Sequence, residues 1–266
     1  MDKNKKKLQL ILLLITILTT ACSINSTKRK NIPDDKINYK KAALLNVDLG
    51  RNYLADGYTE RAKRKFIHAL NLMPNSAEVH SGMGYFWEVV KEYKEAEVHY
   101  RKSIALGNGK GAFYNQYAIF LCQQDRYKEA DHNFLLAIKD KFYDQTSQVY
   151  ANAGMCSLQN NDYKKAEKYF TKGLDHDPKR IELLLELAKM SIYKKEYKIA
   201  ENYLQQFYTL NNKPTAKHLF LSIKVATMLG QEDVAASKAL VLKNLFPDSI
   251  EYNTYKNDIN KDAKHG

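Results

Sequence analysis

A pattern of aromatic, charged and small positions repeats along the chain with a period near 34 residues. Its most regular position is an alanine, which in five units ends a short segment that begins with a tyrosine, as in Tyr93-Lys-Glu-Ala96. The alanine recurs at steps of 34, 34, 36, 34 and 35 residues, at Ala62, Ala96, Ala130, Ala166, Ala200 and Ala235. An aromatic residue follows four positions later at Phe66, Tyr100, Phe134 and Phe170. This repeat predicts six equivalent units between about Ala43 and Ser249.

Each unit is predicted to hold two helices. A small residue stands twelve positions before each of the first five alanines, at Gly50, Gly84, Ala118, Gly154 and Ala188. We expect these two small positions where the helices of a unit cross, because close packing there leaves no room for a large side chain. Prolines fall where units should end, and proline cannot continue a helix; they are Pro74, Pro178, Pro214 and Pro247.

The period and spacing resemble those of tetratricopeptide repeats, which are helix–turn–helix units of about 34 residues. The expected fold is therefore all-α, a right-handed solenoid of about six repeats over residues 42–250. The sixth unit has Gln231-Glu-Asp-Val-Ala235 in place of the aromatic phrase, as expected of a terminal repeat whose outer face meets water. Residues 251–266 form a polar tail without apolar spacing after Tyr255, and we expect it to fray.

The N-terminus reads as an export signal. A cluster of lysines precedes an apolar run from Leu8 to Leu18, which is too short for a bilayer core that needs roughly 20 apolar residues. Thr19-Thr20-Ala21-Cys22 follows and resembles the lipobox of bacterial lipoproteins, although Leu18 stands one place further back than usual. The resemblance implies that residues 1–21 are removed and that Cys22 is lipidated. An ordinary cleaved signal and an inner-membrane anchor are the alternatives.

The segment 22–41 is polar and basic, and it reads as a flexible tether after the lipid anchor. Ser23 follows the cysteine where some lipoproteins have aspartate, and in the lipoproteins that this segment resembles that favours export to the outer membrane. We therefore expect a lipid-anchored protein at the periplasmic face of the outer membrane.

Composition narrows the function classes. With 44% hydrophobic residues, 11 glycines and 5 prolines, the chain is neither collagen-like nor low in complexity, and three cysteines are too few for a disulfide scaffold. The formal net charge of +12 could suggest nucleic acid, yet lysines alternate with glutamates, as in Lys91-Glu92 and Lys94-Glu95, which is typical of a solvated helix face. Export would also remove that partner, so we expect no nucleic-acid binding.

No motif for catalysis, phosphate binding or metal binding is present. The seven histidines are spread over different units, so we expect no catalytic residue, no metal, no cofactor and no small-molecule substrate.

Cys122 and Cys156 lie 34 residues apart in the first helices of adjacent units. Stacked first helices run side by side, so the two sulfur atoms could meet, and an oxidising compartment would permit a bridge. Alternatively, both are buried thiols that pack as small hydrophobic side chains.

Solenoids of this kind bind partners, and in the repeats that this chain resembles the first helices line the inner surface. The candidate groove residues are Val47, Arg51, Leu54, Ser81, Tyr85, Asn115 and Ile119. Their mixed, partly apolar character favours an apolar helix or an extended segment as ligand. Each of them could instead be part of the core between repeats.

Two stretches are more specific than the repeat. Asn115-Gln-Tyr-Ala-Ile-Phe-Leu-Cys122 with Gln124-Asp-Arg-Tyr-Lys-Glu-Ala130, and Leu242-Lys-Asn-Leu-Phe-Pro-Asp-Ser249, resemble the type IV pilus biogenesis/stability family, the PilF/PilW secretin pilotins. The resemblance implies a non-enzymatic outer-membrane lipoprotein that binds the pilus secretin and helps it to localise and multimerise. The alternative is a lipid-anchored scaffold for another envelope machine, such as outer-membrane protein assembly or cell-wall enzyme docking.

Overall fold

The computed structural model describes residues 38–265, with side chains described as far as residue 258. The chain divides into two units, residues 1–41 and 42–266, and the described residues are the last four of the first unit and nearly all of the second. The predicted signal peptide, Cys22 and most of the predicted tether lie outside the described residues.

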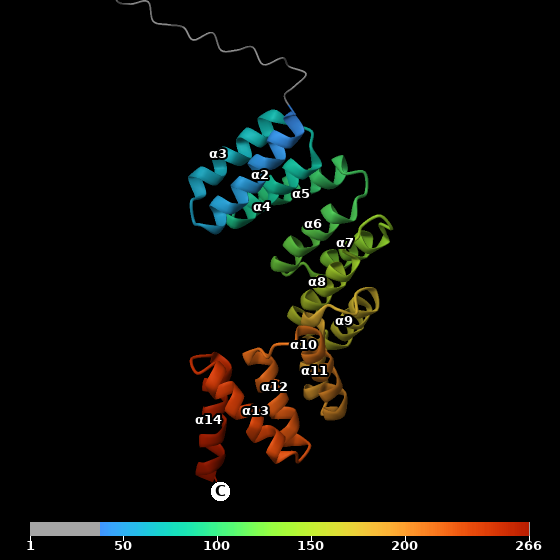
Figure 1. Cartoon of the computed structure of the whole chain (residues 1–266). Coiled ribbons are helices and arrows are strands. Elements are labelled where there is room, and N and C mark those ends of the chain that lie inside the picture. The colour runs from blue at the N-terminus through green and yellow to red at the C-terminus, as the bar shows by residue number, and fades with distance from the viewer. Residues whose placement is uncertain (1–37, 266) are drawn as a thin grey trace, which may run out of the picture. The chain divides into compact units, whose positions relative to one another are not determined.

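Every regular element within residues 38–265 is an α-helix (Figure 1). Twelve helices form six consecutive pairs: α2 (Tyr39–Ala55) with α3 (Thr59–Leu72), α4 (Ala77–Val89) with α5 (Tyr93–Leu106), α6 (Gly111–Gln123) with α7 (Tyr127–Lys139), α8 (Thr146–Gln159) with α9 (Tyr163–His176), α10 (Ile181–Tyr193) with α11 (Tyr197–Asn211), and α12 (Ala216–Met228) with α13 (Glu232–Leu245). A last helix, α14 (Ile250–His265), follows them. The prediction of six helix–turn–helix units is confirmed.

The first helix of the array begins slightly earlier than predicted. Helix α2 starts at Tyr39, inside the segment expected to be a tether. The side chain of Asn38 accepts a hydrogen bond of 2.8 Å from the backbone N–H of Lys41. This contact satisfies an otherwise unpaired N–H in the first turn and sets the start of the helix.

The turn inside each unit repeats with the same period as the sequence. One residue in each turn has a positive φ, and these residues are Gly57, Lys91, Asp125, Asn161, Lys195 and Gly230. The next residue donates its backbone N–H to a carbonyl five positions earlier, as from Glu92 to Trp87 (2.9 Å). This closure satisfies carbonyls at the end of the first helix and turns the chain back. It recurs in every unit, although four of the six left-handed positions are not glycine.

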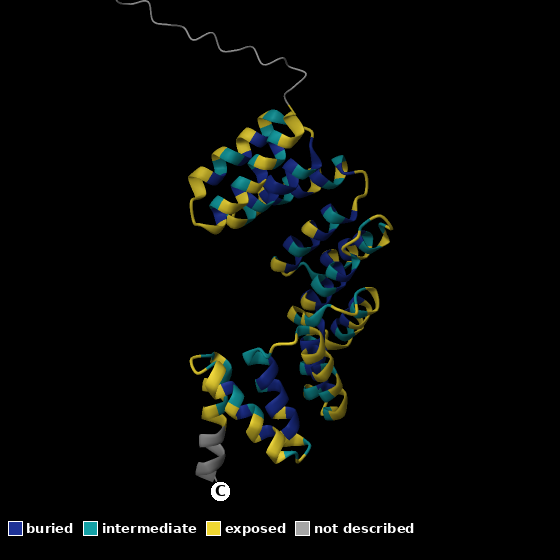
Figure 2. Cartoon of the chain, in the orientation of Figure 1, coloured by how far each residue is buried: buried dark blue, intermediate teal, exposed yellow. Residues whose placement is uncertain are grey.

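The helices of a unit cross where the two small positions meet. The alanines from Ala62 to Ala200 in the repeat are fully buried. In the first, second and fourth units, the aromatic ring four residues after the alanine lies on the glycine of the first helix. A Cβ atom added to Gly154 would lie 2.3 Å from the ring of Phe170, and one added to Gly84 would lie 2.8 Å from the ring of Tyr100. The predicted crossing is confirmed, and buried residues line the seams between paired helices (Figure 2).

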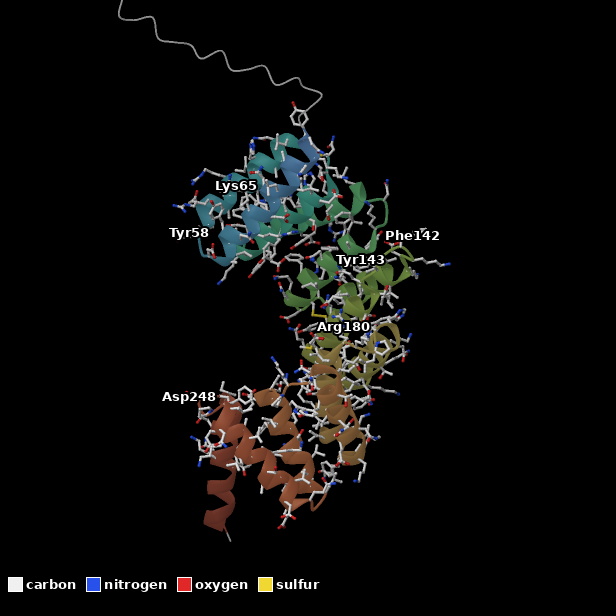
Figure 3. All side chains as sticks on the ribbon, in the orientation of Figure 1. Tyr58, Lys65, Phe142, Tyr143, Arg180 and Asp248 are labelled. Carbon is white, nitrogen blue, oxygen red and sulfur yellow. A yellow bond between two sulfur atoms is a disulfide. The ribbon has the colours of Figure 1, made fainter. Side chains whose placement is uncertain are left out.

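A disulfide bridge joins neighbouring units. Cys122 of α6 and Cys156 of α8 form it, with their Cα atoms 5.8 Å apart, and both are buried (Figure 3). Of the two interpretations left open by the sequence, the structure has the bridge.

The C-terminal segment is helical where the sequence predicted a fraying tail. Ser249 accepts a hydrogen bond of 3.1 Å from the backbone N–H of Tyr252, which caps the first turn of α14. Tyr252 and Tyr255 then pack against the core formed by α12 and α13. The prediction was wrong because two aromatic residues three positions apart suffice to hold one face of this helix on the last repeat.

We expect Ala130→Leu to lower the free energy of unfolding by about 1–3 kcal/mol, because the larger side chain overpacks a fully buried crossing. Urea unfolding followed by circular dichroism measures this change. Ala236→Leu, at an exposed position of α13, is the matched control and should stay within about 0.5 kcal/mol of the wild type. Equal midpoints for Ala130→Leu and the wild type would show that the crossing has spare room.

Removal of the disulfide by the double change Cys122→Ser and Cys156→Ser should lower the free energy of unfolding by about 2–4 kcal/mol, since the bridge closes a loop of 34 residues. The comparison is urea unfolding of oxidised wild type, reduced wild type and double variant. Reduced wild type and the double variant should agree. If oxidised wild type unfolded at the same urea concentration as both, the bridge would contribute nothing to stability.

Candidate partner-binding surface

One position on each of the first four first helices faces outward at the period of the repeat. It directly follows the small residue of the crossing, and its members are Arg51, Tyr85, Ile119 and Met155. Arg51 is exposed, Met155 is 46% exposed, and the other two are half-buried. Helix α6 contacts both α4 and α8, so equivalent positions on these helices follow one another. We call these four residues the first-helix row.

The other predicted groove residues are buried. Val47, Ser81 and Asn115 stand four residues before members of the row and are 3%, 6% and 4% exposed. Their side chains lie between adjacent first helices, as the methyl group of Val47 does, 2.8 Å from where a Cβ of Gly82 would lie. Leu54 is in the same core. The prediction that these four residues line a binding surface was therefore wrong, and they hold the units together.

Asn115 nevertheless has a specific role in positioning the first helices. Its amide oxygen accepts a hydrogen bond of 3.1 Å from the side-chain amide of Asn152 in α8. The amide oxygen of Asn152 accepts a hydrogen bond of 2.9 Å from Gln148. Gln148 in turn accepts a hydrogen bond of 2.6 Å from the guanidinium group of Arg180, which precedes α10 and is labelled in Figure 3. This chain of side-chain hydrogen bonds links three successive units through groups that are buried or half-buried. It fixes the register of the helices that carry the row.

The N-terminal part of the row lies beside a half-buried acid. Glu88 of α4 accepts a hydrogen bond of 2.6 Å from the hydroxyl of Tyr100. Burial raises the pKa of Glu88, although this hydrogen bond and one from Gln123 oppose the rise. Arg51 lies in the row one unit earlier and pairs with Asp48 at 3.6 Å. This end of the surface is therefore polar.

Beyond Met155 the surface becomes apolar. A cavity of about 600 Å³ between α9 and α10 is lined by Leu158, Met190 and the stacked rings of Tyr163 and Tyr193. The ring centroids are 5.5 Å apart, and Tyr193 is 76% exposed. An exposed aromatic pair over an apolar cavity is a typical anchor site for a partner's hydrophobic side chain. We call it the tyrosine pocket.

Lysine and glutamate side chains surround the tyrosine pocket. Lys194 pairs with Glu167 at 2.6 Å, and Lys189 pairs with Glu186. These pairs balance two of the three lysines that line the pocket, and Lys164 adds a third positive charge at its rim. The sequence did not predict this site, because Tyr163 and Tyr193 occupy different positions in their repeats.

The described residues offer little for catalysis. In the part of the chain that the structure covers, no group of three or more histidine, cysteine or acidic side chains could hold a metal ion. The prediction that the histidines are spread over different units is wrong for two of them: His80 and His99 lie in α4 and α5 of one unit and stack, with their Nδ1 atoms 2.8 Å apart. Burial lowers the pKa of both, that of His99 to about 4. Neither lines a described cavity, and the pair packs α4 against α5.

No helix within residues 38–265 is both long enough and apolar enough to cross a bilayer.

Comparison with known proteins agrees with this architecture. The tetratricopeptide repeat family model matches residues 147–180, which include α8 and α9. The type IV pilus assembly protein PilF of Pseudomonas aeruginosa is 32% identical over 246 residues, which are 92% of this chain and 96% of that protein. A solved structure of Pseudomonas aeruginosa PilF matches with a TM-score of 0.68 at 33% identity and covers 84% of this chain and 100% of that one.

The crystal structure of PilW, described as a widely conserved type IV pilus biogenesis factor, shares the fold with a TM-score of 0.68 at 22% identity, covering 80% of this chain and 97% of that one. The repeat architecture, the length of the match to PilF and its level of identity agree with one another. The chain therefore belongs to the PilF family of tetratricopeptide-repeat proteins.

Proposed function

We propose that this protein acts in type IV pilus biogenesis as a lipid-anchored pilotin, which binds the pilus secretin and promotes its localisation and multimerisation in the outer membrane. The observation that carries the proposal is the match to PilF along 92% of the chain. The role is non-enzymatic, and the partner is a protein.

The first-helix row and the tyrosine pocket supply the surface for that partner. The row offers half-buried Tyr85 and Ile119 and exposed Met155, and the pocket adds a rigid pair of exposed rings. Aromatic and methionine side chains of this kind carry much of the binding energy at protein interfaces. A secretin segment with apolar residues along one side is the ligand that suits this surface.

Lipidation at Cys22 would hold this surface beside the membrane in which the secretin assembles. The sixteen residues between Cys22 and the start of α2 at Tyr39, 23–38, would act as a tether and let the solenoid reach a membrane-bound partner. Binding would then occur at the high effective concentration of two partners at one membrane. The anchor proposal is supported by the lipobox resemblance and places the protein at the periplasmic face of the outer membrane.

The anchor is tested by Cys22→Ser. We expect the variant to leave the membrane fraction, because acyl chains are the strong membrane element that remains after signal cleavage. Fractionation and immunoblotting measure the distribution, and Ser23→Ala serves as control and should stay with the membrane. A Cys22→Ser protein that fractionates like the wild type would contradict lipidation as the anchor.

The partner surface is tested by Met155→Asp together with Tyr193→Asp. Both side chains are exposed, so the variant should fold, while carboxylates on an apolar contact should weaken binding at least about ten-fold, or about 1.4 kcal/mol. We expect loss of secretin multimers and of surface pili, measured by immunoblotting and electron microscopy.

Val98→Asp together with Leu240→Asp is the matched control, since these residues are 59% and 57% exposed on second helices. The control should retain multimers. Normal multimers in folded, membrane-bound Met155→Asp/Tyr193→Asp protein would reject this surface, and co-purification with a different envelope complex would favour the scaffold alternative.

A further inference from the structure

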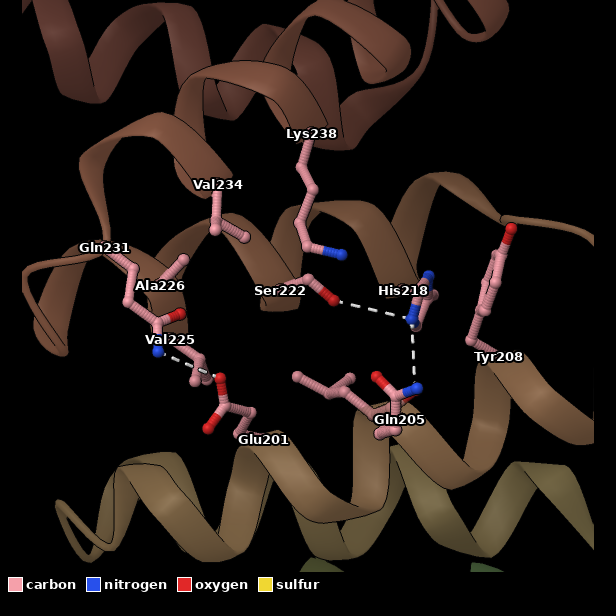
Figure 4. A pocket seen from close by; sticks show the side chains of 11 residues that line it. Glu201, Gln205, Tyr208, His218, Ser222, Val225, Ala226, Gln231, Val234 and Lys238 are labelled. Atoms are coloured by element: carbon pink, nitrogen blue, oxygen red, sulfur yellow. Dashed lines mark hydrogen bonds between the residues drawn. The ribbon is translucent and has the colours of Figure 1, made fainter.

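A second cavity lies among α11, α12 and α13, away from the first-helix row. Its volume is about 760 Å³ (Figure 4). Two of its walls are second helices, α11 and α13, and its floor comes largely from α12. The row is on the first helices α2, α4, α6 and α8, so this cavity is a separate feature of the last two repeats.

A lysine that forms no salt bridge with the described side chains faces the cavity. Lys238 of α13 directs its ammonium group toward Ser222 and His218 of α12 (Figure 4). Among the residues whose side chains are described, none forms a salt bridge or hydrogen bond with this ammonium group. Lys238 is half-buried, so its charge is less well screened than that of a fully exposed lysine. Lys238 interacts electrostatically with Glu201 at the other end of the cavity, yet its ammonium group has no direct hydrogen-bonding partner among the described side chains.

The protonation of His218 decides whether the neighbouring Ser222 hydroxyl can donate a hydrogen bond into the cavity. It is 2% exposed and stacks on Phe207 and Tyr208 at 4.9 and 5.8 Å. Its Nε2 lies 3.2 Å from the carbonyl of Leu204, which can only accept, so Nε2 carries the proton. Ser222 Oγ lies 3.4 Å from the same nitrogen and accepts a hydrogen bond from it. The hydroxyl proton of Ser222 is then available for a hydrogen bond to another partner.

The charge state of His218 agrees with this assignment. Burial first, and Lys238 second, lower the pKa of His218 to about 4, so the ring is neutral at pH 7. Its Nδ1 is buried and has no hydrogen-bond partner among the described residues. Lys238 is thus the cation at this end of the cavity.

The opposite end of the cavity is already neutralised. Glu201 accepts from Gln231 at 3.1 Å and pairs with Lys198 at 3.1 Å. Between the two ends the wall is apolar, formed by Leu204 and Val225 among others. The cavity therefore offers one ammonium group and the Ser222 hydroxyl at one end, the polar side chains of Gln205 and Tyr208, and an apolar wall.

We propose that this cavity binds an aspartate or glutamate side chain in an apolar segment of a protein partner, with Lys238 and Ser222 holding the carboxylate. A carboxylate satisfies an ammonium group and a hydroxyl donor together, and charge-assisted hydrogen bonds of this kind are about twice as strong as neutral ones. The volume exceeds that of one side chain, so apolar neighbours of the acidic residue would contact Leu204 and Val225. The site is independent of secretin binding by the first-helix row.

The test uses the intact chain and two probes, acetyl-Leu-Glu-Leu-amide and acetyl-Leu-Gln-Leu-amide, titrated under nuclear magnetic resonance detection. We expect the glutamate probe to bind at least about ten-fold tighter than the glutamine probe and to shift signals of α12 and α13. Added salt should weaken the glutamate probe and leave the glutamine probe unchanged.

The variant Lys238→Gln should bring the two affinities within about two-fold of each other, whereas Lys243→Gln, at an exposed position on the same helix, should keep the wild-type preference. Equal affinities of the two probes for wild-type protein would overturn the proposal. A preference for the glutamate probe that survives in folded Lys238→Gln protein would also overturn it. So would resonance shifts that are confined to helices α2–α8. The salt dependence of glutamate-probe binding tests the proposal on the wild-type protein alone, without any variant.

Discussion

The close crossing of two helices within each unit is the interaction on which the rest of the structure depends. A glycine or alanine in the first helix meets an aromatic ring from the second, with a buried alanine four residues before that ring. A ring such as that of Phe170 fills the space that a side chain on Gly154 would need. The contact recurs with the sequence period in the first, second and fourth units, where it gives the two helices of the unit the same close crossing.

Stacking decides which first-helix residues can meet a partner. The positions represented by Val47 and Asn115 are buried between neighbouring units, whereas Tyr85 is half-buried and Met155 is exposed. The hydrogen-bonded amides from Asn115 to Gln148 and the bridge between Cys122 and Cys156 then hold α6 and α8 in one register. A row of side chains on rigid, cross-linked helices suits a binding protein, since little order has to be gained on binding.

The sequence was sufficient for the fold because the period, the small positions and the prolines all act within one unit. Features that depend on how units rotate against each other could not be predicted in this way. The burial of Val47 is one example, and the bond between Asn115 and Asn152 is another, since their separation of 37 residues departs from the repeat. The tyrosine pocket combines different repeat positions, Tyr163 and Tyr193, and the cavity beside Lys238 depends on three helices. Helix α14 was missed because two tyrosines and one serine cap suffice to hold it.

The central claim is that the outward face of the first helices is where the secretin binds. Amide hydrogen exchange of the intact chain, with and without purified secretin, tests it most directly. The account predicts that added secretin slows exchange in α4, α6, α8 and α10, around the first-helix row and the tyrosine pocket. Slowed exchange confined to the second helices α5, α7, α9 and α11, or no change anywhere in the solenoid, would contradict it.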